Sequence, residues 1–153
     1  MRVIAAFLII LSPLGLFSPS ASTPEWQNDF NKARQEAMLN GKMILLNFSG
    51  SDWCGPCIRM KKEIFDSEAF IKFATDHLVL VNADFPRNKK NQLGAEQIER
   101  NNALADRFNK DGKFPFTLLL NSRGEIVRQW EGLPDESPEM FVTEMLKTIH
   151  AGT

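Results

Sequence analysis

The only two cysteines of the chain lie within Trp53-Cys54-Gly55-Pro56-Cys57, and this short motif limits the structure that can surround it. An apolar run over residues 43–48 precedes the motif and is typical of a strand buried on both faces. A stretch with helical periodicity follows it over residues 58–65. The sequence therefore predicts a strand, a short exposed turn, and a helix that begins at the second half of the motif.

This arrangement favours sulfur chemistry because the thiolate, rather than the thiol, is the reactive form of cysteine. Unpaired N–H groups and the positive end of the helix dipole favour the anion of Cys54, which we expect to be the nucleophile. Cys57 lies one helical turn further on and can attack the resulting mixed disulfide. Pro56 has no N–H to lose in a first turn, and Gly55 leaves room for the backbone of another protein.

Other uses of a CxxC pair fit the chain less well. A structural zinc site needs four ligands, but beyond the cysteines the chain has only His77 and His150, neither in ligand spacing. An iron–sulfur cluster needs about four thiolates, and covalent haem attachment needs a histidine where this chain has Ile58. A static structural disulfide stays open, although so short a loop would stabilise the fold little. We therefore expect redox chemistry with no metal and no cofactor.

The motif from Trp53 to Cys57 resembles the active-site signature of the thioredoxin superfamily. The wider run over residues 46–54 is similar to thioredoxin-like proteins of bacterial envelopes. A second match covers residues 114–120, where the resemblance implies that Pro115 is the cis-proline that faces the CxxC motif. The two matches together are far more specific than CxxC alone, and the resemblance extends from about Pro24 to the C-terminus.

Further site residues follow only from this resemblance. Trp53, Gly55 and Pro56 are expected to support the two cysteines. Phe114 takes the position that tunes redox behaviour and contacts substrate, with a core aromatic side chain as the simpler alternative. Asp52 is the other candidate for substrate contact, although a solvated or turn-forming carboxylate is favoured at the mouth of the turn.

One position departs from the thioredoxin pattern. Thioredoxin carries a buried aspartate on the strand before the motif, which is thought to accept the proton of the second cysteine. Aligned through Phe48, the residue here is Asn47, and an amide cannot take up a proton in the working pH range. If Asn47 lies beneath Cys57, water or another group must assist, and attack by Cys57 is expected to be slower.

The first 22 residues have the order of a secretory signal peptide. Arg2 is followed by an apolar run over residues 3–11 and by small residues over 18–22. We therefore expect cleavage near residues 20–22 and one thioredoxin-like domain, residues 23–153, in the periplasm or another extracytoplasmic space. The apolar part is short and broken for a membrane span, but no clean Ala-x-Ala is present, so an uncleaved membrane anchor is the alternative.

Residues 23–153 predict an α/β domain with the thioredoxin fold, in which helices flank a central mixed four-stranded sheet. The predicted strands are residues 43–48, 78–84, 116–120 and 125–130. An N-terminal helix opening at Thr23-Pro24-Glu25 would place Trp26 and Phe30 on one face.

The connection before the cis-proline strand is extended. It has a polar loop near residues 86–95 and then a helix to about Asn109, with Ile98, Ala105 and Phe108 expected on one face. Arg87 and two lysines give this loop a basic cluster. A solvated surface loop is the favoured interpretation, and a role in partner choice is the other.

The predicted function is that of an exported thiol–disulfide oxidoreductase. Its Gly-Pro dipeptide resembles the strongly reducing members, so we expect it to reduce disulfides in envelope proteins, with electrons from a membrane thiol donor. Two alternatives stay open, a disulfide oxidase or isomerase of secreted proteins and a non-catalytic adaptor that binds extended peptides beside Pro115. The net charge of −1 gives no reason to expect a nucleic-acid partner, and we expect a monomer.

Overall fold

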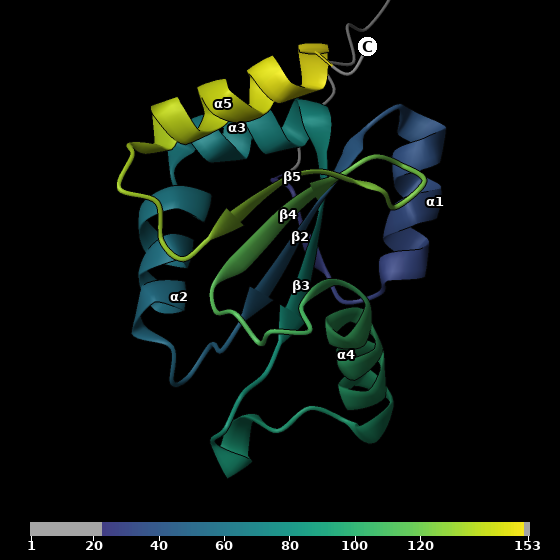
Figure 1. Ribbon diagram of the computed structural model, residues 1–153, viewed down its shortest axis with the longest axis vertical. Coiled ribbons are helices and arrows are strands. Elements are labelled where there is room, and N and C mark those ends of the chain that lie inside the picture. Colours follow the sequence, from purple (N-terminus) through teal and green to yellow (C-terminus); the bar gives the residue numbers. More distant parts are fainter. Residues whose placement is uncertain (1–22, 152–153) are drawn as a thin grey trace, which may run out of the picture.

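The computed structural model describes residues 23–151, so the predicted signal peptide lies outside the described residues. One mixed sheet forms the centre of the molecule, in the strand order β1-β3-β2-β4-β5 (Figure 1). The strands are β1 (Trp26–Gln27), β2 (Met43–Ser49), β3 (Leu78–Asp84), β4 (Phe116–Leu120) and β5 (Ile126–Glu131). The helices are α1 (Phe30–Asn40), α2 (Gly55–Met60), α3 (Glu68–His77), α4 (Ala95–Phe108) and α5 (Pro138–Ala151), with a π-helical turn η1 (Lys61–Phe65) and a 3₁₀ turn η2 (Lys89–Asn91).

Strand pairing brings the two sequence motifs side by side. β2 lies in the middle of the sheet, parallel to β3 and antiparallel to β4. In this register Phe48, near the end of β2, pairs with Phe116 at the start of β4. The CxxC motif follows the C-terminal end of β2, and Pro115 precedes the N-terminal end of β4. Because these two strand ends are neighbours, the motif and Pro115 lie at the same end of the sheet.

The sheet separates two hydrophobic cores, because successive side chains of a strand point to opposite faces. Leu118 packs in one core and Leu119 in the other. The α1/α4 core comprises Phe30, Ala33, Ala37, Ile44, Leu46, Phe48, Val79, Val81, Ala83, Leu104, Phe116, Leu118 and Leu120. The α3/α5 core comprises Leu45, Met60, Ile64, Phe65, Phe70, Phe73, Ala74, Leu78, Leu80, Leu119, Phe141 and Met145. Figure 1 shows α1 and α4 on one side of the sheet and α2, α3 and α5 on the other.

The predicted thioredoxin arrangement is present, with one strand more than expected. The prediction of a helix opening at residues 23–25 was wrong, because Trp26 and Gln27 form β1 and pair with Leu80 and Val81 of β3. Helix α1 begins later, where the Asp29 carboxylate accepts hydrogen bonds from the N–H groups of residues 31 and 32 at 3.0 and 3.1 Å.

Trp26 and Phe30 consequently do not share a face. The Trp26 ring lies 5.0 Å from the Phe65 ring, in contact with the α3/α5 core. Phe30 packs in the α1/α4 core. Trp26 belongs to β1 and Phe30 begins α1, so the two residues are not spaced along one helix.

Of the three residues predicted to share one face of α4, two pack against a core and one is exposed. Ala105 and Phe108 pack against the α1/α4 core, as expected, but Ile98 is 40% exposed. The inward position is taken by Asn101, which is buried and donates from Nδ2 to the carbonyl of Asp84 at 2.8 Å. This polar residue satisfies the last carbonyl of β3.

Within residues 23–151, every helix is too short or too polar to cross a lipid bilayer.

Candidate active site

The two cysteines form a disulfide at the start of α2, with the sulfurs 2.04 Å apart. Cys54 is the N-cap of this helix, and its Sγ accepts a hydrogen bond from the Cys57 N–H at 3.2 Å. Gly55 and Pro56 are exposed, so the predicted strand, exposed turn and helix are present. Each cysteine is nevertheless only 5% exposed, so a partner can reach the sulfur of Cys54 only through a small opening.

The turn before Cys54 is built around Gly50. The Gly50 carbonyl accepts hydrogen bonds from the N–H groups of Trp53 and Cys54, at 3.2 and 2.9 Å. The indole of Trp53 lies against the glycine so closely that a Cβ at residue 50 would come within 2.3 Å of it. Trp53 Nε1 donates to the carbonyl of Phe85 at 2.7 Å, which joins this turn to the segment after β3.

The Phe114–Pro115 peptide bond is cis, which is the conformation implied by the resemblance. The Phe114 ring meets the rings of Trp53 and Phe85 edge to face, with centroids 5.4 and 5.5 Å away. The carbonyl of Pro115 accepts from the Gly132 N–H at 2.9 Å. No hydrogen bond joins the main-chain N–H or C=O of Phe114 to another described residue.

Asp52 anchors the extended loop. Its carboxylate accepts hydrogen bonds from the backbone N–H groups of Arg87 and Asn88, both at 2.9 Å, and from the side-chain amide of Asn91 at 3.0 Å. These bonds, above all that from Arg87, favour the charged carboxylate and lower the pKa of Asp52 below its ordinary value of 3.8. Asp52 lies in the turn over residues 51–53, as favoured, and its carboxylate in addition bonds to a loop far along the chain.

The basic cluster of this loop is also tied to the active-site turn. The guanidinium carbon of Arg87 lies 3.7 Å from the centroid of the Trp53 ring, in a cation–π contact. Lys89 and Lys90 follow on the turn η2 and are exposed. Residues 87–92 are exposed, which agrees with the favoured interpretation of a solvated loop. The loop is in addition fixed to the active-site turn, because the Arg87 side chain contacts Trp53 and the Arg87 backbone bonds to Asp52.

Asn47 lies where the alignment with thioredoxin placed it. It is buried, accepts at Oδ1 from the Thr117 hydroxyl at 3.1 Å, and donates from Nδ2 to Asn82 at 3.2 Å. Asn47 and Cys57 line the same cavity of about 280 Å³, together with Ser49. The side chains that line this cavity include no carboxylate.

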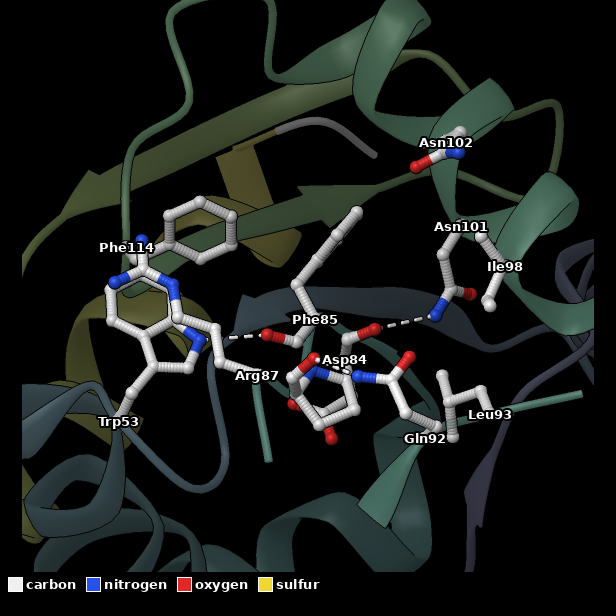
Figure 2. Close-up of a pocket in the computed structure, with 11 residues that line it drawn as sticks. Trp53, Asp84, Phe85, Arg87, Gln92, Leu93, Ile98, Asn101, Asn102 and Phe114 are labelled. Atoms are coloured by element: carbon white, nitrogen blue, oxygen red, sulfur yellow. Dashed lines mark hydrogen bonds between the residues drawn. The ribbon is translucent and has the colours of Figure 1, made fainter. Parts of the chain in front are cut away.

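A second cavity, of about 350 Å³, lies between Trp53 of the active-site turn and helix α4 (Figure 2). Trp53 and Phe114 form one wall, and Ile98 and Asn101 of α4 form the wall across from it. Phe85 lies between the two walls. The cavity therefore begins at the residues next to Cys54 and Pro115.

Sequence reasoning missed three of the residues that fix the two walls, Gly50, Phe85 and Asn101, and it noted Arg87 only as part of a basic cluster. Asn101 could have been suspected, because it is a polar residue among the inward positions of an otherwise amphipathic helix. The others act mainly through backbone groups or ring contacts and carry no local signal. Among residues 23–151, no group of three or more His, Cys, Asp or Glu side chains is placed to hold a metal ion.

Comparison with known proteins adds the following findings. The model of the thioredoxin-like domain family matches residues 30–148. Disulfide bond reductase DsbH of Chlamydia pneumoniae is 34% identical over 106 residues, which cover 69% of this chain and 61% of the relative. Thioredoxin-related protein DsbJ of the same organism is 30% identical over 125 residues, covering 79% of this chain and 35% of the relative.

A solved structure described as a DsbH oxidoreductase superposes with a TM-score of 0.76 at 26% identity, covering 96% of this chain and 95% of that one. A thioredoxin from Thermus thermophilus, with a TM-score of 0.62 at 14% identity, covers 84% of this chain and 88% of its own and shares the fold. The chain thus spans only 61% and 35% of the length of the two Chlamydia relatives.

Proposed function

The chain belongs to the thioredoxin-like family, and from that premise we propose that it is an exported thiol–disulfide oxidoreductase that reduces disulfides in envelope proteins. The observation that carries the proposal is the Cys54–Cys57 disulfide at the start of α2, at the same end of the sheet as the cis-proline Pro115. The relative named a disulfide bond reductase supports the reducing direction.

In the proposed reaction the protein begins with both cysteines reduced. The thiolate of Cys54 attacks one sulfur of a substrate disulfide, which breaks that bond and releases the other substrate sulfur as a thiolate. Cys57 then loses its proton and attacks the Cys54 sulfur, forming the intramolecular disulfide and releasing the second substrate thiolate. Two electrons pass to the substrate, whose two sulfurs end as thiols once they have taken up protons.

The described contacts fit these roles. The Cys57 N–H that donates to Cys54 Sγ would also stabilise a thiolate at that position. A Cβ at Gly55 would meet nothing within 4 Å, so the exposed turn leaves room for the backbone of a substrate. The unpaired N–H and C=O of Phe114 would pair with an extended segment of the substrate, which gives affinity without reading its sequence.

The compartment and partners are part of the proposal. Residues 1–22 would act as a signal peptide and deliver the domain, as a monomer, to the periplasm or an equivalent space. In that oxidising environment the Cys54–Cys57 pair needs a supply of electrons, which we assign to a membrane thiol donor.

The reduction potential of the Cys54–Cys57 pair tests the direction of electron flow. Equilibration with glutathione buffers should give a value close to that of thioredoxin, about −270 mV. A value above about −150 mV would place the protein among oxidants and contradict the reductase proposal. Activity on insulin, compared with refolding of scrambled ribonuclease, separates a reductase from an isomerase.

Two cysteine variants test whether the chemistry is used at all. Cys57→Ser should accumulate mixed disulfides between Cys54 and its substrates in cells, because the resolving thiol is absent. Cys54→Ser should abolish insulin reduction. A Cys54→Ser protein that keeps its partners and its physiological effect would instead support the non-catalytic adaptor.

A further inference from the structure

The 350 Å³ cavity of Figure 2 shares two residues with the proposed reaction site. Trp53 precedes Cys54 directly, and Phe114 precedes Pro115 directly. A substrate whose sulfur is bonded to Cys54 therefore has its neighbouring residues within side-chain reach of this cavity. Its size is that of a site for a small ligand or a single side chain.

The walls of the cavity are held in place by specific bonds. Trp53 is fixed by its hydrogen bond to the Phe85 carbonyl, and Asn101 by its hydrogen bond to the Asp84 carbonyl. The loop that carries Arg87 is held by the Asp52 carboxylate through backbone bonds at residues 87 and 88. The cavity is therefore bounded by anchored groups on the side of the turn, on the side of the loop and on the side of α4.

The lining favours an apolar occupant. Its inner surface is formed largely by the rings of Trp53, Phe85 and Phe114 and by the aliphatic side chains of Leu93 and Ile98. The lining also includes two charged residues, and both of their charged groups are already engaged. The Asp84 carboxylate accepts from Ser49 and Ser51, and the Arg87 guanidinium lies over the Trp53 ring.

We propose that this cavity is a subsite for a large apolar side chain, aromatic or branched aliphatic, that lies beside the disulfide of the substrate protein. This inference rests on the proposed function and adds the substrate feature that the site selects. Burial of such a side chain against three aromatic rings would favour the bound substrate. Ile98 would contribute directly, since it is exposed on α4 and faces the cavity although the rest of its helix face packs inward.

The test uses three disulfide-containing peptides that are identical except for one residue beside the disulfide, which is Phe, Ser or Glu. The full chain, reduced beforehand, is mixed with each peptide, and the second-order rate of peptide reduction is measured. We expect the Phe peptide to react roughly tenfold faster than the Ser peptide, a ratio typical of filling an apolar pocket. Equal rates for the Phe and Ser peptides would overturn the proposed subsite. Faster reduction of the Glu peptide would also overturn it, because it would indicate that the exposed lysines of η2 attract the substrate.

Two substitutions of Ile98 ask whether the preference arises in this cavity. Ile98→Ser removes an apolar side chain from the wall of the cavity, and Ile98→Trp fills part of the cavity. Both variants should therefore lower the ratio of the Phe-peptide rate to the Ser-peptide rate towards one. The matched control is Ile126→Ser, because Ile126 is 48% exposed on β5 and does not line the cavity. A ratio that stays high in both Ile98 variants would overturn the proposal.

Reduction of 2-hydroxyethyl disulfide tests the proposed function separately from the proposed subsite, because this small disulfide has no side chain that could enter the cavity. The control variant Ile126→Ser should reduce it at the wild-type rate, because Ile126 does not line the cavity. If the wild-type protein failed to reduce this small disulfide and all three peptides, the proposed function itself would fail. If it reduced them all at equal rates, only the subsite would be lost.

Discussion

At the scale of single residues, Asn47 decides how Cys57 can lose its proton. Both residues line a cavity that has no carboxylate in its lining, and the amide of Asn47 is engaged with Thr117 and Asn82. A neutral amide can orient a water molecule but cannot accept a proton. Most of the lining is apolar, but Asn47, Asn82 and Ser49 offer hydrogen-bonding groups, and the volume of about 280 Å³ leaves room for a water molecule that could accept the proton.

Substitution of Asn47 by Asp should therefore speed the second chemical step. A carboxylate at residue 47 would be buried beside Cys57, which raises the pKa of a carboxyl group and suits it to accept a proton near neutral pH. We expect the mixed disulfide on Cys54 to be resolved about tenfold faster or more, measured by stopped-flow with a chromophoric disulfide.

The same substitution should cost stability, on the order of 1–3 kcal/mol, because it buries an ionisable group. Asn109→Asp is the control for that cost, since Asn109 is also buried but does not line the cavity beneath Cys57. An unchanged resolution rate in Asn47→Asp, with folding intact, would show that proton transfer does not limit the step.

Asp52 gives a pH-dependent prediction at the same scale. Its hydrogen bonds from the loop lower its pKa below 3.8 in the folded protein, so their stabilising effect is present above that pH. The effect is lost as pH falls through the lowered pKa. Asp52→Asn should therefore reduce the free energy of unfolding near neutral pH, and the difference from wild type should shrink at pH values well below 3.8.

Urea unfolding of both proteins at several pH values measures this difference. Asp135→Asn is the matched control, because Asp135 is an exposed aspartate in the loop before α5. A difference between Asp52→Asn and wild type that stays constant with pH would mean that the charge of Asp52 does not hold the loop.

At the scale of elements, local patterns predicted those segments whose structure is determined locally. β3 and β4 have the predicted bounds. β1 was missed because its two residues pair with β3, far along the chain, and have no periodicity of their own. The attachment of the loop to Asp52 was missed for a similar reason, since two of its three donors are backbone N–H groups, which any sequence offers.

The turn between β2 and α2 gives a prediction at this scale. Gly50→Ala would place a methyl group within 2.3 Å of the Trp53 ring, so the ring must move and its bond to the Phe85 carbonyl must weaken. We expect a loss of about 1–3 kcal/mol in the free energy of unfolding, and slower reduction of peptides because the wall beside Cys54 shifts.

Urea unfolding would measure the loss of stability, and the rate of reduction of the disulfide peptides would measure the second effect. Gly55→Ala provides the comparison for stability, because a methyl group there meets nothing within 4 Å. If Gly50→Ala were as stable as Gly55→Ala, the close packing of Trp53 on the turn would not be needed.

At the scale of the whole molecule, the sheet divides the proposed site between two cores. The helix that begins at Cys54 continues through Met60 and Ile64, which pack in the α3/α5 core. The helix that forms the far wall of the substrate cavity is anchored by Leu104 in the α1/α4 core. The cysteines and the α4 wall of the cavity are thus supported from opposite faces of the sheet. The sequence alone could not assign Ile98 to this wall, because the place of α4 depends on contacts with distant segments, such as the bond from Asn101 to the Asp84 carbonyl.

This division predicts that two core truncations of similar cost will differ in function. Leu104→Ala and Met145→Ala each remove a buried side chain and should each cost about 2–5 kcal/mol in urea unfolding. Because the two residues lie in different cores with the sheet between them, the double variant should lose the sum of the two costs to within about 0.5 kcal/mol.

Only Leu104→Ala should lower the preference for the Phe peptide, since it loosens the helix that carries Ile98. An equal loss of preference in Met145→Ala would show that selectivity depends on overall stability rather than on the wall formed by α4.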